Sequence, residues 1–190
     1  MDPISVIGAV ITGIDVIKLA YQGISKIAGL PKAFEAVQEQ LPFVQATFQI
    51  AKENVEKGSK PLSELPYSQY DPISKLVDQC DKNIKELQRI FSDLEERCKK
   101  DQGSKSWESV RGWYIKALGG IKSRRVESLM KDILRNMEKL GRYEIFQLSA
   151  KLDQIQKAID IFSEIERLEP SIPDSELDTQ GANHATQHIA

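Results

Sequence analysis

The chain has 190 residues, of which 41% are hydrophobic and 28% charged, and this composition indicates one folded domain with a tail rather than a disordered protein. A formal net charge of −2 argues against a general attraction to nucleic acid. Two cysteines, Cys80 and Cys98, are too few for a disulfide framework, so we expect a reducing compartment.

The first predicted element is an apolar helix from Ile4 to Ala28, whose charged residues are Asp15, Lys18 and Lys26. Apolar side chains recur in it at helical spacing: Ile7, Val10, Ile11, Ile14, Ile17, Tyr21, Ile24 and Ala28. The segment lacks the basic start of a signal peptide, and its uncharged run is shorter than a usual membrane span. The pattern favours a buried core helix in the resting protein, and a segment that meets lipid stays open as an alternative.

Three long helices follow from single apolar stripes whose members alternate in spacing between three and four residues. We expect them over 31–57, 71–100 and 142–168, with a loop at 57–71 and Asp71 as the N-cap before Pro72. Pro42 lies inside the first of them, where it should bend the helix without ending it.

Two shorter helices are predicted over 106–118 and 122–140, separated by Gly119 and Gly120. No stretch of comparable length alternates with a period of two. The sequence therefore predicts an all-α helical bundle of about six helices with a core like a four-helix bundle. We expect the bundle to span residues 1–168, and residues 169–190 to form a flexible polar tail after Pro170 and Pro173.

No arrangement of residues predicts catalysis, a cofactor or a small-molecule substrate. His184 and His188 fall in the expected tail without carboxylate or cysteine partners, so we expect no metal site. Cys80 and Cys98 lie on an apolar stripe, where a thiol stays protonated. The Gly119-Gly120 pair lacks the context of a phosphate-binding loop. We therefore expect no enzyme.

A basic stretch covers residues 97–142, with 13 Lys and Arg against 5 Asp and Glu, close to Trp107, Trp113 and Tyr114. Cations beside aromatic residues can bind anionic lipid head groups, and the alternative is an ordinary solvated helix face. Nucleic acid is disfavoured because no base-reading motif accompanies the charge. The candidate head-group contacts are Lys116, Lys122, Arg124, Arg125, Lys131 and Arg135.

The stretch "GLPKAFEAVQEQLPFVQATF", residues 29–48, resembles the fungal SesA and HeLo-like domains. The resemblance is closest over residues 1–57, and beyond them it is one of helix number and length, to about residue 168. It implies a helical bundle that acts as a membrane-targeting cell-death effector in fungal heterokaryon incompatibility or innate immunity. Such domains stand at the N-terminus of NACHT-type receptors or of short proteins that end in an amyloid-forming motif.

The resemblance also implies how such a protein would act. A receptor bearing an amyloid motif would bring the bundles together, and self-association would release the N-terminal segment from a cytoplasmic resting state to the plasma membrane. The end of the chain, "TQGANHATQHIA", has the composition of an amyloid motif but no strongly β-prone run, which leaves this route of activation open.

The residues expected to insert into a membrane are therefore Ile4, Val6, Ile7, Gly8, Val10, Ile11, Gly13 and Ile14. Asp15 would be costly in hydrocarbon, so we expect it near the lipid interface or paired with Lys18. The alternative function is an N-terminal protein-interaction module without membrane activity.

Overall fold

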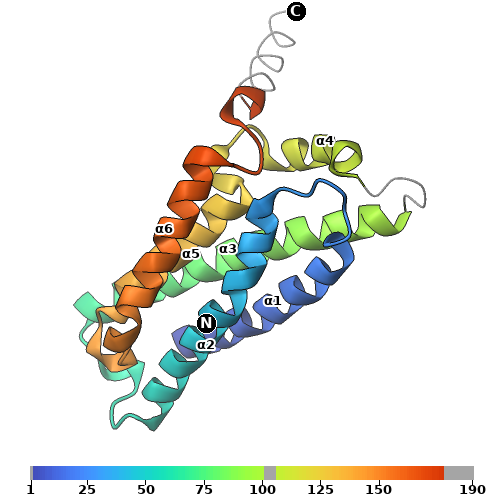
Figure 1. Ribbon diagram of the computed structural model, residues 1–190. Coiled ribbons are helices and arrows are strands. Elements are labelled where there is room, and N and C mark those ends of the chain that lie inside the picture. The colour runs from blue at the N-terminus through green and yellow to red at the C-terminus, as the bar shows by residue number, and fades with distance from the viewer. Residues whose placement is uncertain (1, 101–105, 178–190) are drawn as a thin grey trace, which may run out of the picture.

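The computed structural model describes residues 2–100 and 106–177, and within these ranges it contains helices and no strands (Figure 1). The α-helices are α1 (Pro3–Ile24), α2 (Lys32–Lys57), α3 (Tyr67–Lys100), α4 (Trp107–Leu118), α5 (Val126–Gly141) and α6 (Leu152–Leu168). Short 3₁₀ helices cover Leu62–Glu64, Lys122–Arg124, Glu144–Phe146 and Ser149–Lys151. The predicted all-α helical bundle is confirmed.

α1 and α3 share the most extensive helix–helix contact of the bundle. α2 also packs on α1, α5 packs on α3, and α6 packs on α5. α4 lies across one end of these helices (Figure 1). There Phe34 of α2 stacks with Phe91, Trp107 and Tyr114 at ring-centroid distances of 5.6, 5.5 and 5.4 Å. This aromatic cluster fastens α4 to the bundle.

α1 begins at a capped N-terminus, because the Asp2 carboxylate accepts hydrogen bonds from the backbone N–H groups of Ile4 and Ser5 at 3.2 and 3.3 Å. It ends at Ile24 and not at the expected Ala28. Gly29 has a φ of +79°, a left-handed conformation that suits glycine, and the chain turns there toward α2. α2 then runs through Pro42 without a break, as expected.

α3 starts earlier than the sequence predicted, and Asp71 is not its N-cap. The carbonyl of Pro66 already accepts hydrogen bonds from the N–H groups of Gln69 and Tyr70, so the helix is under way before Pro72 is reached. Asp71 instead pairs with Lys75 one turn later, at 2.9 Å.

The helix predicted over 142–168 is also shorter, because its first third forms 3₁₀ turns. Asn54 of α2 donates its side-chain amide to the carbonyl of Phe146 at 2.9 Å, and Gln147 takes a left-handed φ of 50°. Phe146 and Leu148 are thereby turned into the core. α5 likewise begins at Val126 and not at Lys122, because the Tyr114 hydroxyl accepts the Val126 N–H at 3.1 Å.

Residues 169–177, which we call the strap, correct the expected domain boundary at residue 168. Ser171, Ile172 and Leu177 are buried against the bundle, so this part of the predicted tail belongs to the folded unit. The remainder of the predicted tail, residues 178–190, including His184 and His188, lies outside the described residues.

Candidate functional site

The residues expected to enter a membrane lie on or beside the buried side of α1. Gly13 and four apolar side chains of the set are buried, and the other three members are half-buried. The buried side chains are Val6, Ile7, Val10 and Ile14, and the half-buried residues are Ile4, Gly8 and Ile11. In this structure α1 is therefore docked in the bundle.

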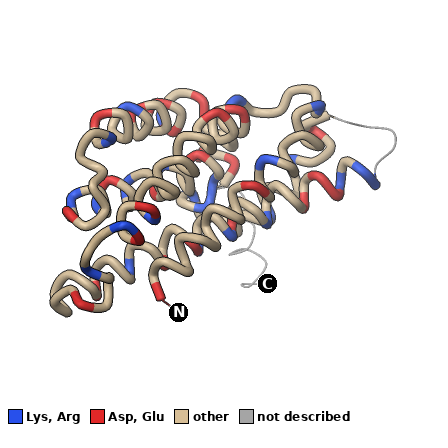
Figure 2. Tube along the Cα trace, turned by 90° about the horizontal axis from the view of Figure 1, so that it is seen from below, with Lys and Arg blue, Asp and Glu red and all other residues tan. Residues whose placement is uncertain are grey.

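The opposite side of α1 is exposed but carries no charge between Asp2 and Asp15. Its solvent-facing residues there are Ser5, Ala9 and Thr12, and Val16 and Leu19 follow beyond Asp15. The Leu19 side chain is 65% exposed. The outward face of α3 is different, because it carries Lys75, Asp78, Lys82, Lys85 and Arg89. In Figure 2 the start of α1 is a tan stretch that follows the red residue at the N-terminus. The first half of α1 is uncharged around its whole circumference.

Glycines bring α1 and α3 close together at two points. A Cβ atom at Gly13 would lie 2.7 Å from Cγ2 of Ile84, and one at Gly23 would lie 2.7 Å from Cγ of Glu95. Gly8 is different, since its nearest neighbour would be Nζ of Lys52 at 4.0 Å. Gly13 is thus required by packing against α3, whereas Gly8 is not.

Gln45 of α2 holds the two charged residues in the middle of α1. Its amide nitrogen donates to the Asp15 carboxylate at 2.8 Å and to the Ile11 carbonyl at 3.0 Å. Its amide oxygen accepts from the Lys18 ammonium at 2.6 Å. In the docked helix Gln45 thus forms a neutral bridge between Asp15 and Lys18.

α1 meets the length and composition of a membrane-crossing helix, with 22 residues and a mean hydropathy of 1.8 over an 18-residue window. The core helix of a water-soluble protein passes the same test.

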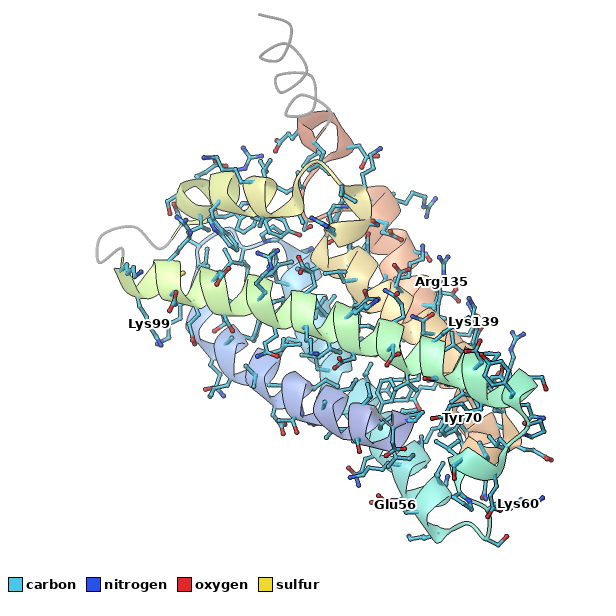
Figure 3. The ribbon with its side chains drawn as sticks, turned by 180° about the vertical axis from the view of Figure 1, so that it is seen from behind. Glu56, Lys60, Tyr70, Lys99, Arg135 and Lys139 are labelled. Atoms are coloured by element: carbon cyan, nitrogen blue, oxygen red, sulfur yellow. The ribbon has the colours of Figure 1, made fainter. Side chains whose placement is uncertain are left out.

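The basic stretch does not form one continuous surface. Lys116, Arg124 and Arg135 are exposed, and Arg135 points outward from α5 together with Lys139 (Figure 3). Lys131 is paired with Glu166 of α6. Of the expected aromatic neighbours, Trp107 and Tyr114 are core residues, and Trp113 lies 5.3 Å from the Arg97 guanidinium. With residues 169–177 packed on it, the Arg125 side chain is only 5% exposed, so in this arrangement it is not available to a lipid head group.

Arg125 holds the strap instead. Its Nη1 donates to the Ile172 carbonyl at 3.0 Å and to the Asp174 carboxylate at 2.9 Å, and its Nε lies 3.4 Å from the Glu127 carboxylate. Asp174 also accepts from Lys122 at 3.0 Å, and Glu176 pairs with Arg111 of α4. Three cations, Arg111 of α4 and Lys122 and Arg125 of the segment before α5, are thus bound to two acids of the strap.

A buried polar network lies beneath these ion pairs. The Glu127 carboxylate is fully buried and accepts the Ser171 N–H at 2.9 Å, and the Ser171 hydroxyl shares a hydrogen bond with the Tyr114 hydroxyl at 2.7 Å. Burial raises the pKa of Glu127, and the hydrogen bond from Ser171 and the charge of Arg125 oppose that rise. Burial also raises the pKa of Tyr114, so its hydroxyl stays protonated. The network fixes the position of the strap on the bundle.

The buried Cys80 is not a reactive thiol, and the described part of the chain holds no cluster of metal-binding side chains. Burial raises the pKa of Cys80 to about 12, which keeps this thiol protonated and unreactive. Within residues 2–100 and 106–177, no group of three or more His, Cys, Asp or Glu side chains is placed to hold a metal ion.

Comparison with known proteins gives a family. The family model of SesA, described as an N-terminal domain on NACHT NTPases and P-loop NTPases, matches residues 7–140. The chain belongs to the SesA family. No curated protein and no solved structure matches it. The place of SesA domains at the N-terminus of NACHT NTPases fits a signalling module, and such a domain is not itself the catalytic part. In this SesA chain, α6 and the strap lie beyond the matched residues.

Sequence reasoning missed two parts of this site. Gln45 is an isolated polar residue on α2, and its partners on α1 are 27 to 34 positions away. The strap was missed because its two prolines and its acids resemble a tail, although Ile172 and Leu177 are apolar signals within it.

Proposed function

We propose that this SesA domain is a membrane-targeting cell-death effector whose α1 leaves the bundle after self-association and permeabilises a membrane. The observation that carries the proposal is the uncharged circumference of α1 from Pro3 to Ile14. Charged residues on an outward face keep a bundle helix soluble, and here they are absent from the first half of α1 and present along α3. An outward face of Ser5, Ala9 and Thr12 is compatible with both water and lipid.

α1 can leave the bundle only if its apolar side chains pass directly into lipid. Five α1 side chains that fill the core, Ile7, Val10, Ile14, Ile17 and Ile24, have no exposed surface. Moving them into water would cost about 7–15 kcal/mol, at about 1.5–3 kcal/mol for each. The hydrocarbon of a bilayer also keeps these side chains out of water, so the free energy of moving α1 from the bundle to the bilayer can be close to zero. This requires that the bundle and the bilayer are in direct contact. Clustering of bundles tips this balance by letting released helices pack on one another.

The charged residues of α1 limit how deeply this helix would insert into the bilayer. Residues 3–14 would span about 18 Å as a helix, which is a little over half of a hydrocarbon core of about 30 Å. Asp15 at the bilayer centre would cost about 3 kcal/mol. In the proposed inserted state, residues 3–14 therefore enter hydrocarbon, and Asp15 and Lys18 stay at the head groups.

The family supplies the proposed partner and location. SesA domains stand on NACHT NTPases, which supports a link to a NACHT-type receptor. In the proposal this receptor carries an amyloid motif that clusters the domains. In this proposal the domain rests in the cytoplasm and moves to the plasma membrane when it is clustered. Anionic lipids are the proposed first contact, through exposed cations such as Lys116, Arg124 and Arg135.

The test introduces a charge that the bundle tolerates and a bilayer does not. Ala9 is exposed, so Ala9→Glu should keep the wild-type melting temperature. A carboxylate within the inserted segment should lower dye leakage from anionic vesicles at least tenfold. Gln154→Glu, which adds the same charge at an exposed position of α6, is the matched control and should leak like wild type.

Wild-type leakage that Ala9→Glu leaves unchanged would contradict insertion of α1. A second candidate function is favoured by the docked state of α1 in this structure: an interaction module that acts through the intact bundle and never enters lipid. Absence of leakage by the wild-type chain at every protein density on the vesicle surface would support this module and overturn the effector.

A further inference from the structure

The chain between α4 and α5 forms a corner with one exposed apolar residue among cations. We call Lys116, Ile121, Lys122, Arg124 and Arg125 the basic corner. Ile121 is 44% exposed and follows Gly119 and Gly120, both of which have left-handed φ angles, 59° and 77°. The turn ends α4 sharply and presents the isoleucine at its tip.

The strap covers one side of this corner with carboxylates. Asp174 binds both Lys122 and Arg125, and Glu176 binds Arg111 on the neighbouring turn of α4. The Asp174 side chain is 54% exposed, so its ion pairs are held at the surface and are weak individually. The apolar contacts of Ile172 and Leu177 and the hydrogen bonds of Ser171 add to them.

We propose that the basic corner is a binding site for an anionic membrane surface, and that the strap occupies it at rest and leaves it when the membrane is engaged. The inference rests on the proposed membrane function and names the surface that makes first contact. An exposed apolar residue followed closely in the chain by the exposed cations Lys122 and Arg124 suits the boundary between head groups and acyl chains, where Ile121 would enter and the cations would meet phosphates.

The strap and an anionic membrane offer the same kind of anionic partner to these cations. The strap offers carboxylates to Arg111, Lys122 and Arg125, and an anionic bilayer offers phosphates and carboxylates to the same groups. Glu127 stays behind as the buried partner of Arg125, so this arginine keeps one anion in both states. Lys116 and Arg124 are exposed already and provide the initial attraction.

The test weakens the strap without removing its apolar anchors. The double substitution Asp174→Asn with Glu176→Gln keeps Ile172 and Leu177 in place and removes the charges of the strap from Arg111, Lys122 and Arg125. The probe is sedimentation with vesicles of phosphatidylcholine containing 30% phosphatidylserine. Each cation near such a surface contributes about a fivefold gain in affinity, so we expect at least a tenfold gain at low salt. Neutral phosphatidylcholine vesicles should show no gain, and high salt should abolish it.

A matched control separates this site from a general effect of net charge. Asp160→Asn with Glu164→Gln removes two acids from the exposed face of α6 and changes the net charge equally. Its gain should be below threefold. Ile121→Glu, added to the strap variant, should remove most of the gain because it places an anion at the tip. Equal gains by the two double variants, or a gain that survives Ile121→Glu, would overturn the proposal.

Failure of this proposal can be told apart from failure of the proposed function. Sedimentation reports the corner, and dye leakage reports α1. Leakage that depends on Ala9 without any gain from the strap variant would reject only the strap. A gain from the strap variant without any leakage would keep the corner and reject insertion of α1.

Discussion

The side-chain amide of Gln45 donates a hydrogen bond to the Asp15 carboxylate at 2.8 Å, and this bond joins α2 to the first charged residue within α1. The same side chain reaches Lys18 and the Ile11 carbonyl. One neutral residue thereby satisfies both ends of the charged pair in α1. It is a polar latch on a helix that is otherwise held by apolar packing.

Gln45→Ala should weaken the docking of α1. It removes three hydrogen bonds, two of them to charged groups, and the site is half-buried, so we expect a loss of about 1–2 kcal/mol in the free energy of unfolding. Urea denaturation followed by circular dichroism measures it. Gln49→Ala is the control, because within the described residues the side-chain hydrogen bond of Gln49 goes to Glu53 of the same helix, and its loss should change stability by less than about 0.5 kcal/mol. Equal losses in both variants would refute the latch.

Gly13 and Gly8 should respond oppositely to alanine. Gly13→Ala places a methyl group where Ile84 lies, and we expect a loss of about 1–3 kcal/mol from overpacking between α1 and α3. Gly8→Ala meets only the flexible end of Lys52, so the gain in helix propensity should stabilise the protein by about 0.5–1 kcal/mol. The melting temperatures of the two variants measure these changes. A Gly13→Ala protein that is more stable than wild type would contradict the close approach of Gly13 to Ile84.

Arg125 and Arg124 are neighbours in sequence with very different environments. Arg125→Ala leaves the buried Glu127 carboxylate without its cation and should cost about 3–5 kcal/mol of stability. Arg124 is exposed, and Arg124→Ala should cost less than about 0.5 kcal/mol. Chemical denaturation measures both. Similar costs for the two would mean that the strap network does not stabilise the fold.

The strap should loosen in acid. Hydrogen bonding from Lys122 and the charge of Arg125 hold the pKa of Asp174 below its ordinary value of 3.8. A carboxyl group whose folded pKa is lowered stabilises the fold above 3.8 and loses that contribution as the pH falls through its folded pKa. The amide signals of Ser171 and Ile172, followed by NMR from pH 5 downward, should shift with an inflection below 3.8. The inflection should be absent in Asp174→Asn, and its persistence there would assign it to another group.

Local patterns in the sequence were enough to predict most helices. The alternating spacing of apolar residues in α2 and α3 appears in the structure as buried faces, because one side of each helix must pack whatever its neighbours are. Two of the errors fall where a residue from another element intervenes. The Phe146 carbonyl accepts a hydrogen bond from the Asn54 side chain in place of the expected helical one, and the Tyr114 hydroxyl accepts the Val126 N–H at the start of α5.

The sequence by itself determined that this protein is an all-α bundle with an uncharged first helix, since periodicity and the absence of charge are properties of neighbouring residues. Only the tertiary structure decided that α1 is docked, that Gln45 holds its charges, and that Arg125 binds the strap and not solvent. These facts depend on which surfaces meet. A buried ion pair or a glycine contact exists only where two segments far apart in the chain are brought within a few ångströms of each other.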